Sequence, residues 1–65
     1  MVKMKNMVRI KRIERNLRQA ELAEMACCSQ QEISAIEKGE VMPTIFVALC
    51  IARALETTVD ELFIL

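Results

Sequence analysis

The stretch that decides the fold is residues 19–39, which read QAELAEMACCSQQEISAIEKG. Apolar residues in its first part, 19–26, recur at helical spacing and leave glutamine and glutamate side chains on the other side. The same spacing returns in residues 30–38, where two isoleucines share one side of the helix. The stretch therefore predicts two short helices joined by a tight interruption at residues 27–29.

The second of these helices has a clear start and a clear end. Ser29 and Glu32 have the spacing of a capping box, in which the serine hydroxyl accepts from a free backbone N–H and the glutamate reaches back to the serine N–H. Ile33 and Ile36 then point toward the core, and Gly39 provides the left-handed residue that often closes a helix. We expect polar residues to cover the remaining surface of this helix.

Similar signals predict three further helices on either side of this stretch. A first helix over about residues 2–15 contains no Gly or Pro, and Asn16 is suited to the left-handed conformation at its end. Thr44 is expected to cap a fourth helix over about 45–55, and a second capping-box pattern at 58–61 opens a last helical turn through Phe63. The expectation is an all-α domain of five helices, without strands.

Length and composition limit the architecture. With 65 residues, the chain is expected to form a single domain over residues 1–65. Its apolar fraction of 54% exceeds the usual ~45–50%, so either the core is unusually rich or a second copy covers part of the apolar surface. The longest apolar run, Ile45 to Ala52, has 8 residues against the ~20 needed to cross a bilayer, so no membrane span is expected.

Cysteine usage and residue chemistry exclude several functions. The three cysteines, Cys27, Cys28 and Cys50, lack the even, spaced arrangement of a disulfide-stapled domain, and we expect reduced thiols in the cytoplasm. The chain has no histidine and no C-x-x-C motif, so neither a metal site nor a cofactor is expected. The cysteines have no base partner in the sequence and no Gly-rich phosphate loop is present, so we expect no enzyme activity and no small-molecule substrate.

A net charge of zero conceals a strong asymmetry. Residues 1–18 carry seven basic residues and one acidic residue, a net charge of +6, whereas residues 19–65 carry two basic and eight acidic residues, a net charge of −6. A basic end is typical of a protein that binds a polyanion, because clustered cations attract phosphates. A solvated charged helix would explain the same pattern equally well.

Taken together, the segments from about Val8 to Phe63 resemble the Cro/C1-type, or lambda repressor-like, helix-turn-helix family. The matching segments are residues 12, 17–23, 29–39, 43–44, 51–55 and 59–63, which read R, LRQAELA, SQQEISAIEKG, PT, IARAL and VDELF. The resemblance implies a compact five-helix DNA-binding domain, with the helix-turn-helix formed by the second and third helices. In that fold the third helix enters the major groove of double-stranded DNA.

The resemblance and the side-chain chemistry together give candidate base-reading residues. Gln30 and Gln31 open the third helix, and a glutamine amide pairs with the N6 and N7 edge of adenine. Ser34 can hydrogen-bond several bases, and Ala35 matches a position that touches a thymine methyl in some relatives. The alternative, for proteins outside this family, is that glutamine side chains at the start of a helix contact only solvent.

A second group of residues is expected to contact phosphates or to brace the reading residues. The resemblance places Gln19 beside the first residue of the recognition helix, where it bonds a phosphate and supports that neighbour. Phosphate contacts, which set register without reading sequence, are expected for Arg12 and Lys38. Arg18 and Ser29 complete this group.

The resemblance also predicts an ion pair between Arg12 and Glu37 that ties the first helix to the recognition helix. A glutamate on a helix that faces DNA would repel phosphate unless it were neutralised, so the pairing makes electrostatic sense. The alternative is that both side chains are independently exposed to solvent.

Two positions depart from the family pattern. Relatives usually have glycine in the turn where this chain has Cys27; because a Cβ in the left-handed conformation costs roughly 1 kcal/mol, the turn is expected to differ in shape. The loop at 40–43 lacks the basic residues that many relatives direct toward the DNA backbone. We therefore expect weaker DNA binding with a shallower salt dependence.

These observations predict a sequence-specific transcriptional regulator, expected to be a repressor. The alternative is a protein-interaction module, such as an antitoxin-like or co-regulator domain with weak DNA binding. It is favoured by the apolar surface of the fourth helix and by the missing loop cations.

The sequence further predicts a homodimer, at least on DNA. Residues 45, 49 and 52 share one stripe of the fourth helix, and residues 48, 51 and 55 lie close beside it. Both rows are expected to face the core, which leaves the stripe of Phe46, Cys50 and Arg53 outward. Ile64 and Leu65 extend the apolar pattern beyond the expected domain, and a cluster of exposed apolar residues commonly marks an interface. A two-fold dimer would place two recognition helices about 34 Å apart, one turn of DNA.

Overall fold

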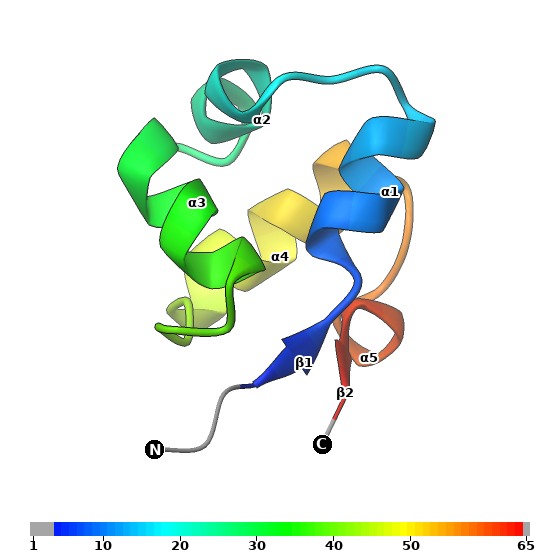
Figure 1. The fold of residues 1–65 in the computed structure, drawn as a ribbon. Helices are drawn as coiled ribbons and strands as arrows, with labels where there is room; N and C mark the ends of the chain where they lie inside the picture. The colour runs from blue at the N-terminus through cyan, green and yellow to red at the C-terminus, as the bar shows by residue number, and fades with distance from the viewer. Residues whose placement is uncertain (1–3, 65) are drawn as a thin grey trace.

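The computed structural model describes residues 4–64. Five helices surround a common core, and a two-stranded sheet joins the two ends of the chain (Figure 1). In chain order the elements are β1 (Lys5–Asn6), α1 (Val8–Glu14), α2 (Gln19–Met25), α3 (Gln30–Glu37), α4 (Ile45–Ala54), α5 (Val59–Leu62) and β2 (Phe63–Ile64). The five expected helices are therefore confirmed.

The core draws large apolar side chains from every helix. Its largest fully buried members are Val8, Leu22, Ile33, Ile36, Ile51, Leu55 and Leu62. Each is buried because the apolar positions of its helix fall on one side at helical spacing, and removing that surface from water stabilises the fold by about 25 cal/mol per Å². The predicted inward placement of Ile33 and Ile36 is confirmed, and it turns the polar residues of α3 away from the core.

Side-chain caps set the starts of the later helices. The Ser29 Oγ accepts from the Glu32 N–H at 3.0 Å, so the serine half of the predicted capping box is present. Thr44 caps α4 through the Val47 N–H in the same way, and Thr58 caps α5 through the Glu61 N–H. Each cap satisfies one of the backbone donors that a helix start leaves without a partner.

The turn between α2 and α3 keeps the left-handed geometry of a glycine turn although it contains cysteine. Cys27 has φ 59°, the Cys28 N–H donates to the Ala23 carbonyl at 3.0 Å, and the Cys27 N–H donates to the Glu24 carbonyl. These two bonds form a Schellman motif, which satisfies the last carbonyls of α2. The expected change in the shape of this turn is therefore wrong.

The N-terminal segment differs from the sequence prediction. The first helix begins at Val8, and Lys5 and Asn6 instead form a strand that pairs antiparallel with Phe63 and Ile64. The expectation of no strand is wrong here, as is the helical assignment of the described residues before Val8. Residues 2–3, which were also predicted to belong to this helix, lie outside the residues that the structure describes.

A single side chain explains why the helix starts where it does. The Asn6 Oδ1 accepts from the Val8 N–H at 3.1 Å and its Nδ2 donates to the Ile36 carbonyl at 2.8 Å. Asn6 thus satisfies a free donor at the start of α1 and holds the strand against the end of α3.

α4 and its C-cap Leu55 bury Ala48, Ile51, Ala52 and Leu55 as predicted, but not the first two residues of the predicted inward stripe. Ile45 and Leu49, expected in the core, are 81% and 56% exposed, whereas Val47, Ala48 and Ile51 are buried. The predicted inward stripe is therefore wrong for its first two members. No helix within residues 4–64 is long and apolar enough to cross a membrane.

Candidate nucleic-acid interface

The N-terminus of α3 presents its polar side chains beside the start of α2. Gln30 and Gln31 are exposed, because burial of Ile33 and Ile36 fixes the rotation of the helix about its axis. A shallow hollow between the two helices is lined by Gln19, Gln30, Gln31 and Ser34. Four of the predicted DNA-contacting residues therefore meet at one place, where α2 and α3 pack against each other (Figure 1).

Ser34 and Ala35 lie one turn further along α3. Both are half-buried, so they are less open to an incoming ligand than the two glutamines. Ser34 lines the hollow, whereas Ala35 does not.

The other residues predicted to contact phosphates differ in their exposure to solvent. Arg18, which precedes α2, and Lys38, which caps the end of α3, are exposed. Ser29 is also exposed, and because its Oγ accepts the capping bond, its hydroxyl hydrogen remains available as a donor.

The structure brings Arg12 and Glu37 together in a largely buried ion pair. Arg12 Nε lies 2.6 Å from Glu37 Oε2, and Arg12 Nη2 donates to Oε1 at 3.3 Å. Arg12 Nη1 donates to the Leu17 carbonyl at 2.8 Å, and the two charged side chains are only 11% and 3% exposed. The pair ties α1 to α3 and neutralises the carboxylate of the recognition helix.

This burial does not favour the phosphate contact predicted for Arg12. All three of its guanidinium nitrogens donate to groups of the protein itself. A phosphate would have to approach a side chain that is nearly covered. The geometry supports the structural role of Arg12, which joins α1 to α3 through Glu37.

Gln19 takes part in the same network. Its Nε2 donates to Glu37 Oε1 at 3.1 Å, so the brace in the free protein runs to Glu37. The sequence did not indicate this contact, because residue spacing shows which side chains share a helix face but not which atoms of two helices meet.

Local hydrogen bonds and burial shift three pKa values. The backbone N–H of Arg18 holds the pKa of Glu21 below its usual value, because the bond favours the carboxylate. Hydroxyl bonds from Thr57 and Thr58 likewise lower the pKa of Glu61. Burial raises the pKa of the Cys28 thiol, with smaller contributions from neighbouring acidic groups, so this cysteine is a poor nucleophile at neutral pH.

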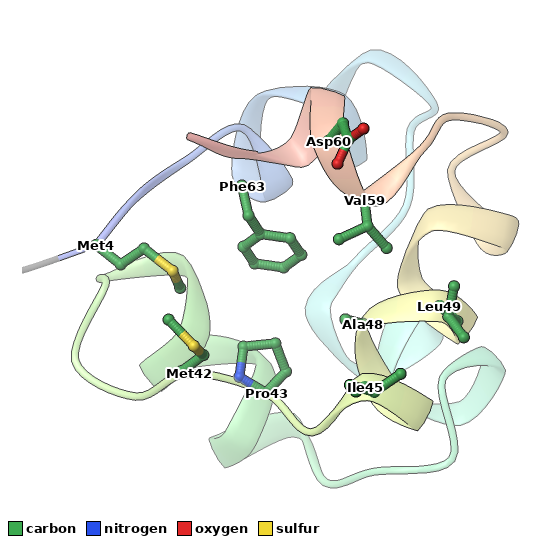
Figure 2. A pocket seen from close by; sticks show the side chains of 9 residues that line it. All are labelled: Met4, Met42, Pro43, Ile45, Ala48, Leu49, Val59, Asp60 and Phe63. Atoms are coloured by element: carbon green, nitrogen blue, oxygen red, sulfur yellow. The ribbon is translucent and has the colours of Figure 1, made fainter. Parts of the chain in front are cut away.

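An apolar cleft, which the sequence analysis did not identify, lies on a different part of the molecule. It has a volume of about 370 Å³ and lies between the 42–43 loop, α4 and the C-terminal segment. Figure 2 shows the ring of Phe63 reaching into the cleft, Pro43 and Ala48 opposite it, and the sulfur atoms of Met4 and Met42 at one end. The high apolar fraction was the signal for uncovered apolar surface, but it did not show the position of the cleft.

The residues predicted for the dimer interface differ in exposure, and none of those that the structure describes lines this cleft. Phe46 is 63% exposed, and Ile64 is also exposed, whereas Cys50 is half-buried against the core. Leu65 lies outside the described residues. Met42, Ile45 and Leu49 add exposed apolar surface that the sequence analysis had not assigned to an interface.

Comparison with known proteins agrees with this architecture. The helix-turn-helix family matches residues 8–62. The chain is 41% identical over 63 residues to an uncharacterized HTH-type transcriptional regulator of Methanothermobacter thermautotrophicus, and the match covers 95% of this chain and 91% of that protein. It is 34% identical over 60 residues to the uncharacterized HTH-type transcriptional regulator YgzD of Bacillus subtilis, covering 92% and 91%.

Two solved structures share the fold. The restriction-modification controller protein C.AhdI of Aeromonas hydrophila superposes with a TM-score of 0.77 at 24% identity, over 83% of this chain and 82% of that chain. The clp gene regulator ClgR of Corynebacterium glutamicum gives the same TM-score and identity, over 83% of this chain and 57% of its own. With the family match over residues 8–62, these likenesses confirm the resemblance drawn from the sequence: the chain belongs to the Cro/C1-type helix-turn-helix family of DNA-binding transcriptional regulators.

Proposed function

We propose that the chain reads a specific sequence of double-stranded DNA by placing the N-terminus of α3 in the major groove. The observation that carries this proposal is the convergence of Gln19, Gln30, Gln31 and Ser34 on one exposed hollow. A recognition helix that enters the groove by its N-terminal end presents Gln30 and Gln31 first.

The candidate base-reading residues fall into two groups according to their exposure to solvent. Gln30 and Gln31 are exposed at the tip of the helix, and each amide supplies the donor and acceptor that the adenine edge requires. Ser34 and Ala35 are half-buried, so in this proposal they contact bases only after the helix has entered the groove. The serine hydroxyl serves as a donor or an acceptor, and the alanine methyl group packs against thymine.

The phosphate contacts come from side chains at the ends of α2 and α3. Ser29, Lys38 and Arg18 are exposed, and Gln19 keeps one amide hydrogen beyond the one that it donates to Glu37. The 40–43 loop adds no cation, so few counterions are released on binding, and the affinity is modest with a shallow salt dependence.

In this proposal the protein acts as a repressor in the cytoplasm. Repression requires only that the protein occupy its site on the DNA, which the reading helix can accomplish. The three cysteines are free thiols, which fits a reducing compartment.

Two copies bind together in this proposal, through the apolar surface around Phe46. The exposed Phe46 lies next to Ile45, which lines the apolar cleft, so one side of α4 carries both a protruding aromatic ring and a hollow. An interface with two-fold symmetry uses the same surface on both copies and therefore needs such self-complementarity. Ile64, exposed on β2, and the half-buried Cys50 are the other described residues assigned to this interface.

The experiment that tests DNA reading is selection of bound duplexes from a random pool, followed by titration of variants. Gln30→Ala and Gln31→Ala are each expected to weaken binding to the selected duplex by ~1–3 kcal/mol and to leave binding to random duplex nearly unchanged. Glu24→Ala, an exposed change on α2 outside the hollow, serves as the control. Equal losses on selected and random duplexes would contradict base reading.

The second candidate, a protein-interaction module, is favoured by the apolar cleft. Its lining is almost entirely apolar, with Asp60 as the single charged member. The same titration separates the two functions: binding that ignores sequence and disappears at moderate salt would indicate that the main partner is another protein.

A further inference from the structure

We propose that the apolar cleft between the 42–43 loop, α4 and the C-terminal segment binds a small apolar cation, such as an amine that carries a phenyl ring. This proposal goes beyond the proposed function, which assigns no ligand other than DNA and a second copy. The ligand is bound and released unchanged, as an effector rather than a substrate.

The cleft has the size and the lining of a small-molecule site. Its volume is about 370 Å³. Ligand pockets measure roughly 300–1,000 Å³ and are mainly apolar, with a few polar groups that orient the ligand. Along α4 the lining runs from Ile45 and Leu49, which are 81% and 56% exposed, to Ala48, which is 7% exposed. The cleft therefore has depth, and a small ligand leaves water when it enters.

The apolar walls can adapt to the shape of a ligand. Figure 2 shows the sulfur atoms of Met4 and Met42 at one end of the cleft and the ring of Phe63 reaching into it. Methionine side chains are unbranched, so they repack around ligands of different shape. The ring of Phe63 offers a surface on which a phenyl group can pack.

Asp60 determines which charge the ligand carries. It is the only charged residue of the lining, it is exposed, and it forms no salt bridge within residues 4–64. A positive group beside this carboxylate is attracted, whereas a negative group is repelled. An inorganic cation would gain nothing from the apolar walls, and a hydrocarbon would leave Asp60 without a partner. The ligand that fits both features has an apolar body and one positive end.

A ligand in the cleft connects the two ends of the chain to the segment that follows the recognition helix. The Met4 N–H donates to the Gly39 carbonyl at 3.2 Å, just after α3, and Phe63 belongs to the strand that pairs with β1. Because the ligand contacts Met4 and Phe63 together, it binds the paired ends more tightly than frayed ends. Binding to the folded state alone is expected to raise the melting temperature.

The test is a titration with phenylbutylamine, followed by NMR of the methionine methyl groups. Met4 and Met42 line the cleft, whereas Met25 is 50% exposed outside it and serves as the internal control. The Met4 and Met42 signals are expected to shift until they saturate, and the Met25 signal is expected to stay in place.

The charge of the ligand is tested with phenylbutyrate, which has the same ring and a negative end. The amine is expected to bind about 10-fold or more tightly than the carboxylate, because Asp60 attracts one and repels the other. Asp60→Asn is expected to reduce this ratio below about 3-fold. Glu24→Gln removes an exposed carboxylate outside the cleft and should leave the ratio unchanged.

The titration is repeated with Phe46→Ser, which weakens the proposed dimer without adding a charge, so that a second copy does not cover the cleft. The proposal would be overturned if neither protein showed saturable shifts at Met4 and Met42, if Met25 shifted equally, or if the amine and the carboxylate bound equally. Met4 and Met42 signals that respond to protein concentration but not to the amine would overturn it in favour of a second copy. Selection of a DNA sequence tests the proposed function separately.

Discussion

Arg12 and Arg15 lie within one helical turn of each other, and each pairs with a glutamate, yet their surroundings differ sharply. Arg12 and Glu37 are 11% and 3% exposed, whereas Arg15 and Glu56 are 39% and 71% exposed. Water screens the second pair and leaves it little net energy. The first pair has been removed from water, so each charge depends on its partner.

Truncation of the two arginines is expected to give different losses of stability. Arg12→Ala leaves the Glu37 carboxylate buried and unpaired, and is expected to lower the free energy of unfolding by about 3–5 kcal/mol. Arg15→Ala is expected to cost about 1 kcal/mol or less. Urea unfolding followed by circular dichroism measures both, and Arg15→Ala is the matched control. Similar losses for the two variants would mean that burial of the Arg12 pair has no special effect.

For single residues, the sequence predicted which side chains belong to the site better than it predicted which of their atoms are in contact. The family resemblance predicted that Arg12 and Glu37 would meet, and the structure brings them together. The bond from Gln19 to the same carboxylate was not predicted, because it depends on how closely α2 and α3 approach. Residue spacing also does not show how deeply the Arg12 guanidinium is buried. This burial is what argues against a phosphate contact.

Among the elements, the helices that begin with a capping residue were the easiest to locate. Ser29, Thr44 and Thr58 each accept from a backbone N–H three residues later, a contact that depends only on local sequence. The strands were missed because their pairing joins Lys5 to Ile64, and nothing local in either segment indicates the other.

The exposure of Ile45 and Leu49 on α4 was missed for a different reason. Every residue from Ile45 to Ala52 is apolar, so the helical period is present on all sides and identifies no inward face. The neighbours of the helix, chiefly α2 and α5, decide the rotation. They bury Val47 and Ile51 and leave Ile45 and Leu49 outside.

The cap of α5 is expected to make stability depend on pH. Hydrogen bonds from the hydroxyls of Thr57 and Thr58 are the main cause that lowers the pKa of Glu61 from its usual value of 4.5. Because the folded pKa lies below the unfolded one, the contribution of Glu61 is present above pH 4.5 and is lost as the pH falls through the folded value. Glu61→Gln is expected to reduce the fall in melting temperature between neutral pH and about pH 3.

Glu24→Gln provides the control for this titration, since it removes an exposed carboxylate that makes no hydrogen bond among the described residues. Its melting temperature should follow that of wild type across the same range. A Glu61→Gln profile parallel to wild type would show that the cap does not contribute to the acid sensitivity.

The molecule carries two surfaces that differ in polarity, one polar and one apolar. The hollow between α2 and α3 is lined by amide and hydroxyl groups, whereas the cleft beside α4 is lined by methionine, isoleucine, leucine and phenylalanine side chains. A surface of the second kind on a small domain commonly marks an interface. The separation allows one surface to contact DNA while the other contacts a second copy.

The dimer is expected to be sensitive to charge at Phe46. Phe46→Glu places a carboxylate on the apolar surface, and burial of an unpaired charge there would separate the two copies. Sedimentation equilibrium, with and without a selected duplex, is expected to show a dimer for wild type and a monomer for this variant. Ile10→Glu, at an exposed isoleucine of α1, is the matched control and should remain dimeric.

The dimer would be refuted by a wild-type protein that is monomeric without DNA and that binds the selected duplex as a single copy on one half-site. A selected site without near-palindromic symmetry would argue against it independently, because a two-fold protein contacts two related half-sites.

The pairing of the chain ends has a consequence for the order in which the domain assembles. Lys5 and Ile64 are 59 positions apart, so their strands close a loop of nearly the whole chain. Closing such a loop costs entropy before its contacts compensate, so this pairing forms late in folding and opens first. The reading helices α2 and α3 are neighbours in sequence and can persist when the ends fray. Met4 and Phe63, which line the apolar cleft, belong to the part that opens. Loss of the end pairing would therefore disrupt the surface that we propose for a second copy, while α2 and α3 stay packed against each other.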